Sequence, residues 1–334
     1  MRRFVSLVLL LLLLDRACPG GALNLTPVIG VLTTPSDTSG CETFFNAPRT
    51  TPLPDTSSAV SCFNAYYVKW IESAGAKVAV IPFDMDQATL LPYLGTLNGV
   101  LFTGGGLNLW FNNTYVQTAK FIYDYVLDTN AKGNTFVLWG TCMGFQLLNI
   151  LTANNESVLD TYAFDSEDLS LPLNLSIAPA ASRLLSAMPA DILEILTQQN
   201  STMNFHHDGV RPTTFLGNAN LTQFYRMLST NVDRKGHAFV STIESKNLPV
   251  YGNQWHPERP QFEWTPNEGI SHTPDAIRAM QWMANFFINE ARKSTNVFPE
   301  SQYPMLIYNQ RLLGEFWEQF YVIGSAGRPI LLKH

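Results

Sequence analysis

Short runs of apolar, often β-branched residues alternate with longer helical patterns in the first part of the chain, and this alternation constrains the fold most. The pattern predicts strands at 27–32, 77–81, 99–102 and 135–139, and helices at 60–73, 86–94 and 115–127. Continuously apolar strands separated by helices are typical of parallel βαβ units whose sheet is covered on both faces. We therefore expect a three-layer α/β fold with a mostly parallel central sheet.

The rest of the chain is less regular. The segment 155–230 is expected to hold short strands and one or two helices, and the aromatic tail from Ser301 onward cannot be placed. Further elements are predicted as follows: a long loop at 33–58, strands at 238–243 and 249–254, and a helix at 274–293. Because no internal repeat or clear linker interrupts the pattern, residues 23–334 are expected to form a single domain.

The N-terminus has the layout of a cleavable secretory signal. Arg2 and Arg3 precede an apolar run at 4–14, and the small residues 20–22 follow. The run is too short to span a bilayer, although a short retained anchor is the alternative. We expect residues 1–22 to be removed and the mature protein to be soluble, without a membrane segment. Six Asn-x-Ser/Thr sequons fit this route as candidate glycosylation sites: Asn24, Asn112, Asn155, Asn174, Asn200 and Asn220.

Charge and cysteine content exclude two classes of protein. Only 14% of the 334 residues are charged, and the net charge is −6. A general nucleic-acid binder needs a basic surface, so no nucleic-acid partner is expected. Four cysteines are too few for a disulfide-built scaffold, and each must be interpreted individually. Glycans on the sequons would supply part of the missing surface polarity.

Cys142 lies in the sharpest motif of the chain. The sequence Gly140-Thr-Cys-Met-Gly144 follows an apolar strand and precedes a helical pattern, which is the nucleophile elbow G-x-S-x-G with sulfur in place of oxygen. The two glycines permit a sharp turn that lifts the thiol above the sheet edge, at a helix N-terminus that stabilises negative charge. The Met143 N–H would be free to stabilise an oxyanion. The alternative is an inert buried cysteine at a strand-to-helix turn.

His256 is the candidate base for this thiol. It lies at the end of a predicted strand in the sequence Gln254-Trp-His-Pro-Glu258. Residues two apart in an extended segment project to the same side, so Glu258 can orient the imidazole while its other nitrogen faces Cys142. The alternative is a surface turn that merely ends the strand.

Gly104, Gly105 and Gly106 follow the third predicted strand, beside the fourth in a sequentially wound sheet. An N–H of this loop, assigned to Gly105, could complete the oxyanion hole. A phosphate-binding turn or a flexible loop is the alternative. No phosphate-binding motif follows the first strand, which argues against a nucleotide cofactor.

With these motifs in view, the sequence resembles the γ-glutamyl hydrolases, a branch of the class I glutamine amidotransferase-like superfamily with a flavodoxin-like sheet. The resemblance covers nearly the whole mature chain. It depends on the following segments: 27–32, 67–75, 99–105, 138–146, 204–206, 251–258, and 269–272 with the helix to Arg292. The chain departs from the family in the long loop 33–58, which could alter access to the cleft.

The resemblance implies hydrolysis of folyl- and antifolyl-poly-γ-glutamates in lysosomes, in vacuoles or outside the cell. It implies that Cys142 is the nucleophile, His256 the general base and Glu258 the residue that orients it, while His206 binds or polarises the substrate or is merely structural. It also implies a homodimer. No metal or organic cofactor is expected, since no cysteine or histidine cluster has zinc-ligand spacing. Because substrate and protein are both acidic, any attraction between them must be local.

The other cysteines fit this scheme. Cys18 would leave with the signal. Cys41 and Cys62 flank the long loop and could pair in an oxidising compartment, or could remain two free thiols.

Three rival functions remain open at this point. A glutamine amidotransferase shares the thiol chemistry, but the signal and the lack of a synthetase domain count against it. A papain-like protease shares the order of cysteine and histidine but lacks the signature around the cysteine. A glycoprotein could also retain the fold as a binding module, although Cys142, His256 and Glu258 are all present.

Overall fold

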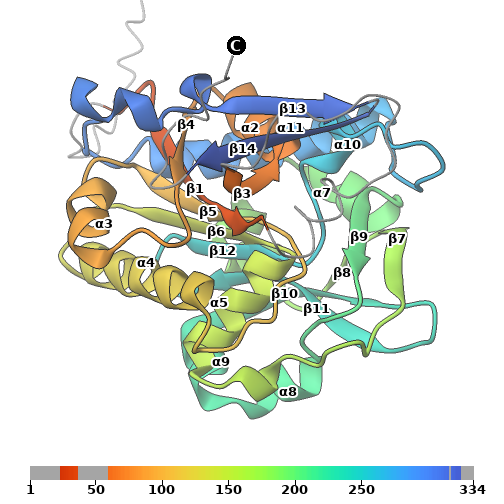
Figure 1. Ribbon diagram of the computed structural model, residues 1–334. Helices are drawn as coiled ribbons and strands as arrows, with labels where there is room; N and C mark the ends of the chain where they lie inside the picture. The colour runs from red at the N-terminus through yellow and green to blue at the C-terminus, as the bar shows by residue number, and fades with distance from the viewer. Residues whose placement is uncertain (1–22, 37–58, 316, 325–334) are drawn as a thin grey trace, which may run out of the picture.

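The central sheet has eight strands and is mostly parallel, as predicted. Figure 1 shows the computed structural model, which describes residues 23–36, 59–315 and 317–324. The strands lie in the following order: β4 (Lys77–Ile81), β1 (Val28–Leu32), β5 (Gly99–Phe102), β6 (Val137–Thr141), β12 (Val250–Asn253), β11 (Ala238–Ser245), β10 (Tyr225–Val232) and β8 (Asn174–Leu175). Neighbours from β4 to β12 pair in parallel, and the pairs from β12 to β8 are antiparallel.

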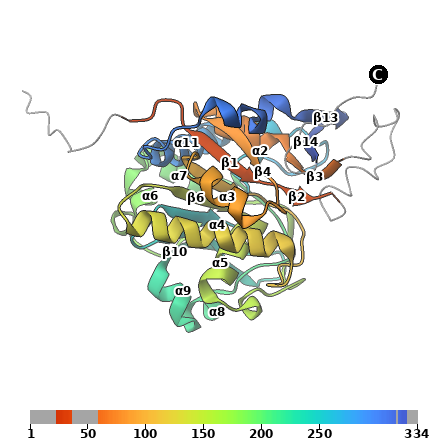
Figure 2. The same ribbon diagram turned by 60° about the vertical axis from the view of Figure 1, so that its left-hand side comes forward.

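Helices cover both faces of this sheet (Figures 1 and 2). One face carries α3 (Gln87–Leu94), α4 (Thr114–Ala131), α5 (Met143–Ala153), α8 (Pro212–Gly217) and α9 (Ala219–Phe224). The other face carries α2 (Ala65–Ser73), α6 (Arg183–Ala187), α7 (Ala190–Gln198) and α11 (Pro274–Ala291). The expected three-layer α/β fold is therefore confirmed.

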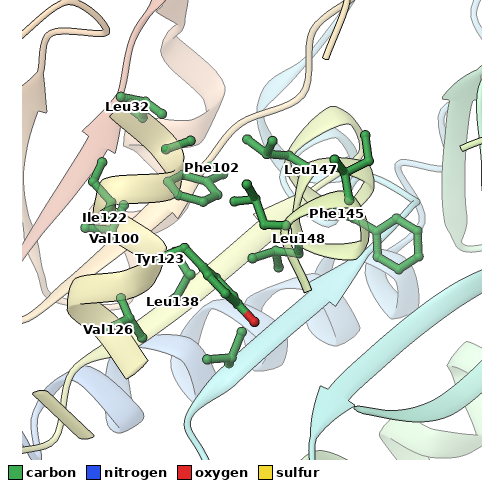
Figure 3. Close-up of a cluster of buried hydrophobic side chains, with 14 of the residues drawn as sticks. Leu32, Val100, Phe102, Ile122, Tyr123, Val126, Leu138, Phe145, Leu147 and Leu148 are labelled. Carbon is green, nitrogen blue, oxygen red and sulfur yellow. The ribbon is translucent and has the colours of Figure 1, made fainter. Parts of the chain in front are cut away.

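Alternating side chains of the buried strands pack into the two cores. In β5, Val100 and Phe102 join the core beneath α4 and α5, while Leu101 joins the opposite core. Figure 3 shows the first core, in which residues of both helices and of three strands are buried together: Leu32, Val100, Phe102, Ile122, Tyr123, Val126, Leu138, Phe145, Leu147 and Leu148. Strands that are buried on both faces explain the continuous apolar runs in the sequence.

A second sheet corrects one sequence prediction. Its order is β13 (Arg311–Glu315), β14 (Glu318–Gly324), β3 (Ala59–Asn64) and β2 (Thr34–Pro35). The helix predicted from residue 60 is therefore wrong in its first part, since α2 begins only at Ala65. Strand β3 pairs with β14 from the far end of the chain, a partner that the local pattern around β3 could not reveal.

The irregular middle of the chain forms a small two-stranded sheet beside the central one. Strands β7 (Ser166–Leu171) and β9 (Thr202–His206) pair in antiparallel fashion. The segment holds four α-helices among its described residues, α6 to α9, where one or two were expected. The remaining short helices are η1 (Glu156–Val158), η2 (Pro179–Ala181), α10 (Arg259–Phe262), η3 (Glu300–Met305) and η4 (Ile307–Asn309).

Several element ends differ from the predicted ones. Strand β6 begins at Val137 and continues through Gly140 and Thr141, two residues beyond the predicted end. Strand β12 ends at Asn253, so His256 lies beyond the strand rather than at its end. Helix α4 continues to Ala131, past the predicted end at residue 127. Over the described ranges, no helix has the length and apolarity needed to cross a membrane.

The candidate glycosylation sites lie mostly at the surface. Five of the six sequon asparagines are exposed and Asn24 is half-buried. The Asn220 Nδ2 donates a hydrogen bond to the Ala153 carbonyl at 3.1 Å, so a glycan there would have to break this contact.

Cys62 is disulfide-bonded. The predicted partner Cys41, the signal with Cys18, and most of the 33–58 loop lie outside the described residues.

Candidate active site

Cys142 occupies a sharp turn between β6 and α5. Its φ of 52° and ψ of −109° are unusual for a residue with a side chain, as expected at a nucleophile elbow. A Cβ on Gly140 would lie 2.6 Å from the Gly144 carbonyl oxygen, and a Cβ on Gly144 would overlap the Phe102 carbonyl. Both glycines are therefore required by close approach of the backbone, for the reason predicted from the motif.

The surroundings of Cys142 place its sulfur at the carboxyl ends of two strands. The Cys142 N–H donates to the Asn253 carbonyl of β12 at 2.8 Å. The thiol lies 3.7 Å from the Phe205 carbonyl oxygen, and the Gln254 Nε2 lies 3.7 Å from the same sulfur. Only 3% of Cys142 is exposed, and it is the free cysteine of the described residues. Cys142 is therefore held in place by contacts from two segments that are distant from it in sequence.

His256 and Glu258 form a buried pair beside this turn. The His256 Nδ1 lies 2.5 Å from the Glu258 Oε1, and neither residue is more than 3% exposed. The His256 N–H donates to the Met203 carbonyl of β9 at 2.8 Å, which anchors the segment. The pair forms through a turn and not through the extended geometry expected, because β12 has ended and Glu258 has helical dihedral angles.

Burial and the carboxylate act in opposite directions on His256. Burial lowers the pKa of His256, but the Glu258 carboxylate raises it, and the net pKa lies above the ordinary value. The nearby Cys142 thiol also raises the pKa of His256. A carboxylate that stabilises the imidazolium is the arrangement that lets a histidine accept a proton from a nearby nucleophile.

Gly104 is the point at which the cysteine and the histidine meet. A Cβ on Gly104 would lie 2.9 Å from the His256 Cε1 and 3.3 Å from the Cys142 Cβ, so both side chains contact this glycine. The Gly104 N–H donates to the Tyr67 hydroxyl at 2.8 Å, which ties the glycine loop to α2. Sequence reasoning missed Tyr67, since nothing in the helical pattern distinguishes it from other buried aromatic residues.

The side chain of Met143 lies against Gly105, and these are the two residues expected to supply the oxyanion donors. A Cβ on Gly105 would lie 2.9 Å from the Met143 Cε, and Gly105 has a φ of 158°. The Gly104 N–H is used by Tyr67, whereas the N–H groups of Gly105 and Met143 have no acceptor among the described residues. The Met143 N–H lies in the first turn of α5, where helices leave donors without an internal partner.

His206 lies behind the cleft. Its Nδ1 lies 2.9 Å from the Asp208 carbonyl oxygen, while its Nε2 is buried without a partner in the described part of the chain. Burial lowers the pKa of His206 to about 3, so the ring is neutral. The preceding residue Phe205 lines the cleft, but His206 does not. A contact between His206 and substrate therefore stays a prediction.

A cleft of about 340 Å³ opens over Cys142 and His256. Its walls come from four parts of the fold: the second sheet, α2 with Tyr66 and Tyr67, the loop 104–106, and Phe205 with Arg259. Sequence reasoning did not find Arg259, although it directly follows the His-Pro-Glu segment. A cleft with a cysteine, a histidine and free backbone donors can hold and polarise a carbonyl group.

This fold and this site define the class of α/β proteins that carry a cysteine at a nucleophile elbow. The sequence model of the family described as Peptidase C26 matches residues 49–258. The chain belongs to the γ-glutamyl hydrolases of this family, which confirms the resemblance seen in the sequence.

The relatives match over most of their length. The chain is 36% identical to γ-glutamyl hydrolase B of Dictyostelium discoideum, over 98% of this chain and 91% of that protein. It is 38% identical to the γ-glutamyl hydrolase of Homo sapiens, over 70% of this chain and 72% of that protein. It is 35% identical to γ-glutamyl hydrolase 1 of Arabidopsis thaliana, over 88% of this chain and 80% of that protein.

Proposed function

We propose that this protein is a cysteine-dependent hydrolase that cleaves the γ-glutamyl bonds of folyl- and antifolyl-poly-γ-glutamates through a thioester intermediate. The observation that carries the proposal is the meeting of Cys142 and His256 over Gly104, at the base of a cleft. Family membership supplies the bond class, since the relatives are γ-glutamyl hydrolases. Together they support nucleophilic attack by sulfur on a γ-amide carbonyl.

In the first half of the reaction, Cys142 attacks the γ-carbonyl carbon and its proton passes to His256. The carbonyl oxygen becomes an oxyanion that accepts hydrogen bonds from the N–H groups of Met143 and Gly105. His256 then donates the proton to the departing amine nitrogen as the carbon–nitrogen bond breaks. The acyl group is left as a thioester on Cys142.

In the second half, water attacks the thioester. His256 takes a proton from the water, and the tetrahedral intermediate collapses to release the γ-carboxylate and the Cys142 sulfur, which regains the proton. Glu258 holds the His256 Nδ1 throughout, so the Nε2 remains the nitrogen that faces the reacting atoms. Proton, sulfur and histidine thus return to their starting state.

Processing, location and assembly belong to the same proposal. Residues 1–22 direct the chain into the secretory pathway and are removed, and residues 23–334 act as one domain in the lysosome or vacuole, or outside the cell. The exposed sequon asparagines support this route. The active form is a homodimer, by analogy with the family alone.

The decisive experiment incubates the secreted protein with pteroyl-penta-γ-glutamate and follows chain length by chromatography. Wild type is expected to shorten the chain and release glutamate, whereas Cys142→Ala should leave it intact. Failure of wild type at every pH from about 4 to 8 would refute the proposal. Trapping the thioester on the peptide that contains Cys142, followed by mass mapping, tests the nucleophile separately.

Glutamine amidase activity is the alternative that shares this chemistry. It differs in substrate, because the leaving group is ammonia and the acyl donor is free glutamine. The same preparation should therefore be tested for ammonia release from glutamine. Release that exceeds γ-glutamyl peptide cleavage would favour the amidase, and activity in neither assay would leave only a binding role.

A further inference from the structure

The charges that line the cleft suggest how an acidic protein could bind a polyanionic chain. Among the described residues that line the cleft, Arg259 is the only arginine or lysine. Glu167 and Glu318 are the acidic residues in the same walls, and Glu167 pairs with His207 at 2.9 Å. A negatively charged substrate therefore has one cationic side chain to approach in this part of the site.

Two aromatic rings hold the Arg259 guanidinium in a fixed position. Its central carbon lies 4.3 Å from the centre of the Phe205 ring and 5.6 Å from that of Tyr66. Only 10% of the side chain is exposed. A guanidinium flanked by aromatic rings loses little further freedom when it binds an anion, since the rings already restrict its rotation.

The hydrogen-bonding capacity of Arg259 is only partly used. Its Nε lies 3.0 Å from the Glu263 Oε2 and its Nη1 lies 3.6 Å from the Glu268 Oε2. Neither contact has hydrogen-bond geometry, and both nitrogens are buried without an acceptor in the described part of the chain. Both nitrogens are buried against these carboxylates, so an incoming carboxylate has to approach through the remaining nitrogen, Nη2, which makes no hydrogen bond or ion pair with the described residues.

We propose that Arg259 binds an α-carboxylate of the substrate next to the scissile γ-amide and thereby selects γ-linked glutamate. The inference rests on the proposed function. Every residue of a γ-linked glutamate chain keeps its α-carboxylate free, on both sides of each bond. Because Arg259 directly follows Glu258 and lines the same cleft as Cys142 and His256, such a carboxylate would lie within reach while the carbonyl is attacked.

The two neighbouring carboxylates set the conditions for this binding. Burial, followed by the charge of Glu263, raises the pKa of Glu268 to about 7. Burial also raises the pKa of Glu263, against the lowering effect of Arg259. The pKa of the Arg259 guanidinium is also raised by three nearby groups, those of Tyr66, Tyr67 and Glu258. Below neutral pH, Glu268 is protonated and no longer competes with the substrate for Arg259.

The test is a double comparison of variant and substrate, made on the secreted protein. Three pteroyl-di-γ-glutamates are needed: the natural one, one with an α-carboxamide on the acyl side of the bond, and one with an α-carboxamide on the leaving side. Arg259→Met is compared with the matched control Arg278→Met, whose side chain is 53% exposed and pairs with Asp191 on the surface. Dissociation constants are measured in the Cys142→Ala background.

Arg259→Met is expected to weaken binding of the natural compound about tenfold to a hundredfold, the range for loss of a hydrogen bond between charged groups. One of the two carboxamides should bind the Cys142→Ala protein that retains Arg259 that much more weakly and should lose no further affinity in Arg259→Met, which identifies the carboxylate. Arg278→Met should match wild type. Equal losses on all three compounds, or none, would overturn the proposal.

The test separates failure of the proposed function from failure of the Arg259 assignment, and a second variant replaces Arg259→Met if that protein does not fold. Wild type that binds as expected but cleaves none of the compounds contradicts the proposed function while the assignment of Arg259 stands. If Arg259→Met does not fold, Glu268→Gln serves instead, and it should tighten binding of the natural compound about twofold to fivefold at neutral pH. Unchanged or weaker binding in Glu268→Gln would count against the assignment.

Discussion

The two walls of the cleft are built by different means. On one wall, Cys142 and His256 meet at Gly104, where their own side chains leave no room for a Cβ. The turn that carries Cys142 is packed so closely against backbone that Gly140 and Gly144 have no room for a side chain either. On the other wall, Arg259 is positioned by rings and carboxylates that touch it only through side chains. The first wall fixes the reacting atoms by close packing, whereas the charge of the second wall changes with pH. Chemistry and recognition should therefore respond differently to substitution.

The largest effect is expected at the reacting pair. His256→Asn removes the group that accepts and returns the proton, so kcat should fall by about 10³-fold to 10⁶-fold with little change in the affinity for substrate. Steady-state kinetics, together with binding in the Cys142→Ala background, separates the two quantities. A large loss of affinity with kcat preserved would place His256 in recognition and would remove the distinction between the walls.

A smaller but still large effect is expected from Glu258→Gln. The amide cannot stabilise an imidazolium, so kcat should fall by about 10²-fold to 10⁴-fold. The pKa of His256 should fall as well, because Glu258 raises it and burial alone lowers it. Titration of the His256 ring by NMR, with and without Glu258→Gln in Cys142→Ala protein, measures the shift directly. A pKa that is unchanged or higher would contradict the assigned cause.

Substitution of a glycine tests steric exclusion without touching a reacting group. Gly144→Ala would drive a methyl group into the Phe102 carbonyl, and it should lower the free energy of unfolding by roughly 3 kcal/mol or more. Gly217→Ala is the matched control, because nothing lies within 4 Å of its added Cβ. Chemical denaturation of both variants gives the comparison, and equal stabilities would show that the elbow backbone can relax.

The same contrast explains what the sequence could predict. The nucleophile elbow can be predicted from the sequence because Gly140, Cys142 and Gly144 lie close together in the chain and form a local motif with a steric cause. The sequence also predicts the contact between His256 and Glu258, but through an extended backbone. In the structure a turn makes this contact, because the strand ends at Asn253. Local spacing brought the two residues together in either geometry.

The second wall could not be read in this way. Arg259 acquires its position from Phe205 and Tyr66, which lie on β9 and at the start of α2 and are distant in sequence. The wall also includes residues of β3 and β14, two strands that pair only in the folded chain. Neither propensity nor periodicity carries information about such partners, so the sequence pattern predicts helix where β3 lies.

The smallest effect is expected at the junction of the two walls, where the Tyr67 hydroxyl accepts the Gly104 N–H. Tyr67→Phe should lower the free energy of unfolding by about 1 kcal/mol, the usual worth of one hydrogen bond. Tyr93→Phe is the matched control, because its buried hydroxyl donates to the Val80 carbonyl at 2.9 Å in the opposite part of the fold.

Both tyrosine variants should therefore lose similar stability, but only Tyr67→Phe should lower kcat, by several-fold. The reason is that Tyr67 positions the loop whose next N–H, that of Gly105, is the second oxyanion donor. Thermal unfolding and steady-state kinetics on the two variants separate positioning from stability. If kcat falls equally in both, the loss follows general destabilisation, and the glycine loop owes its position to the steric contacts of Gly104 with Cys142 and His256 rather than to the hydroxyl.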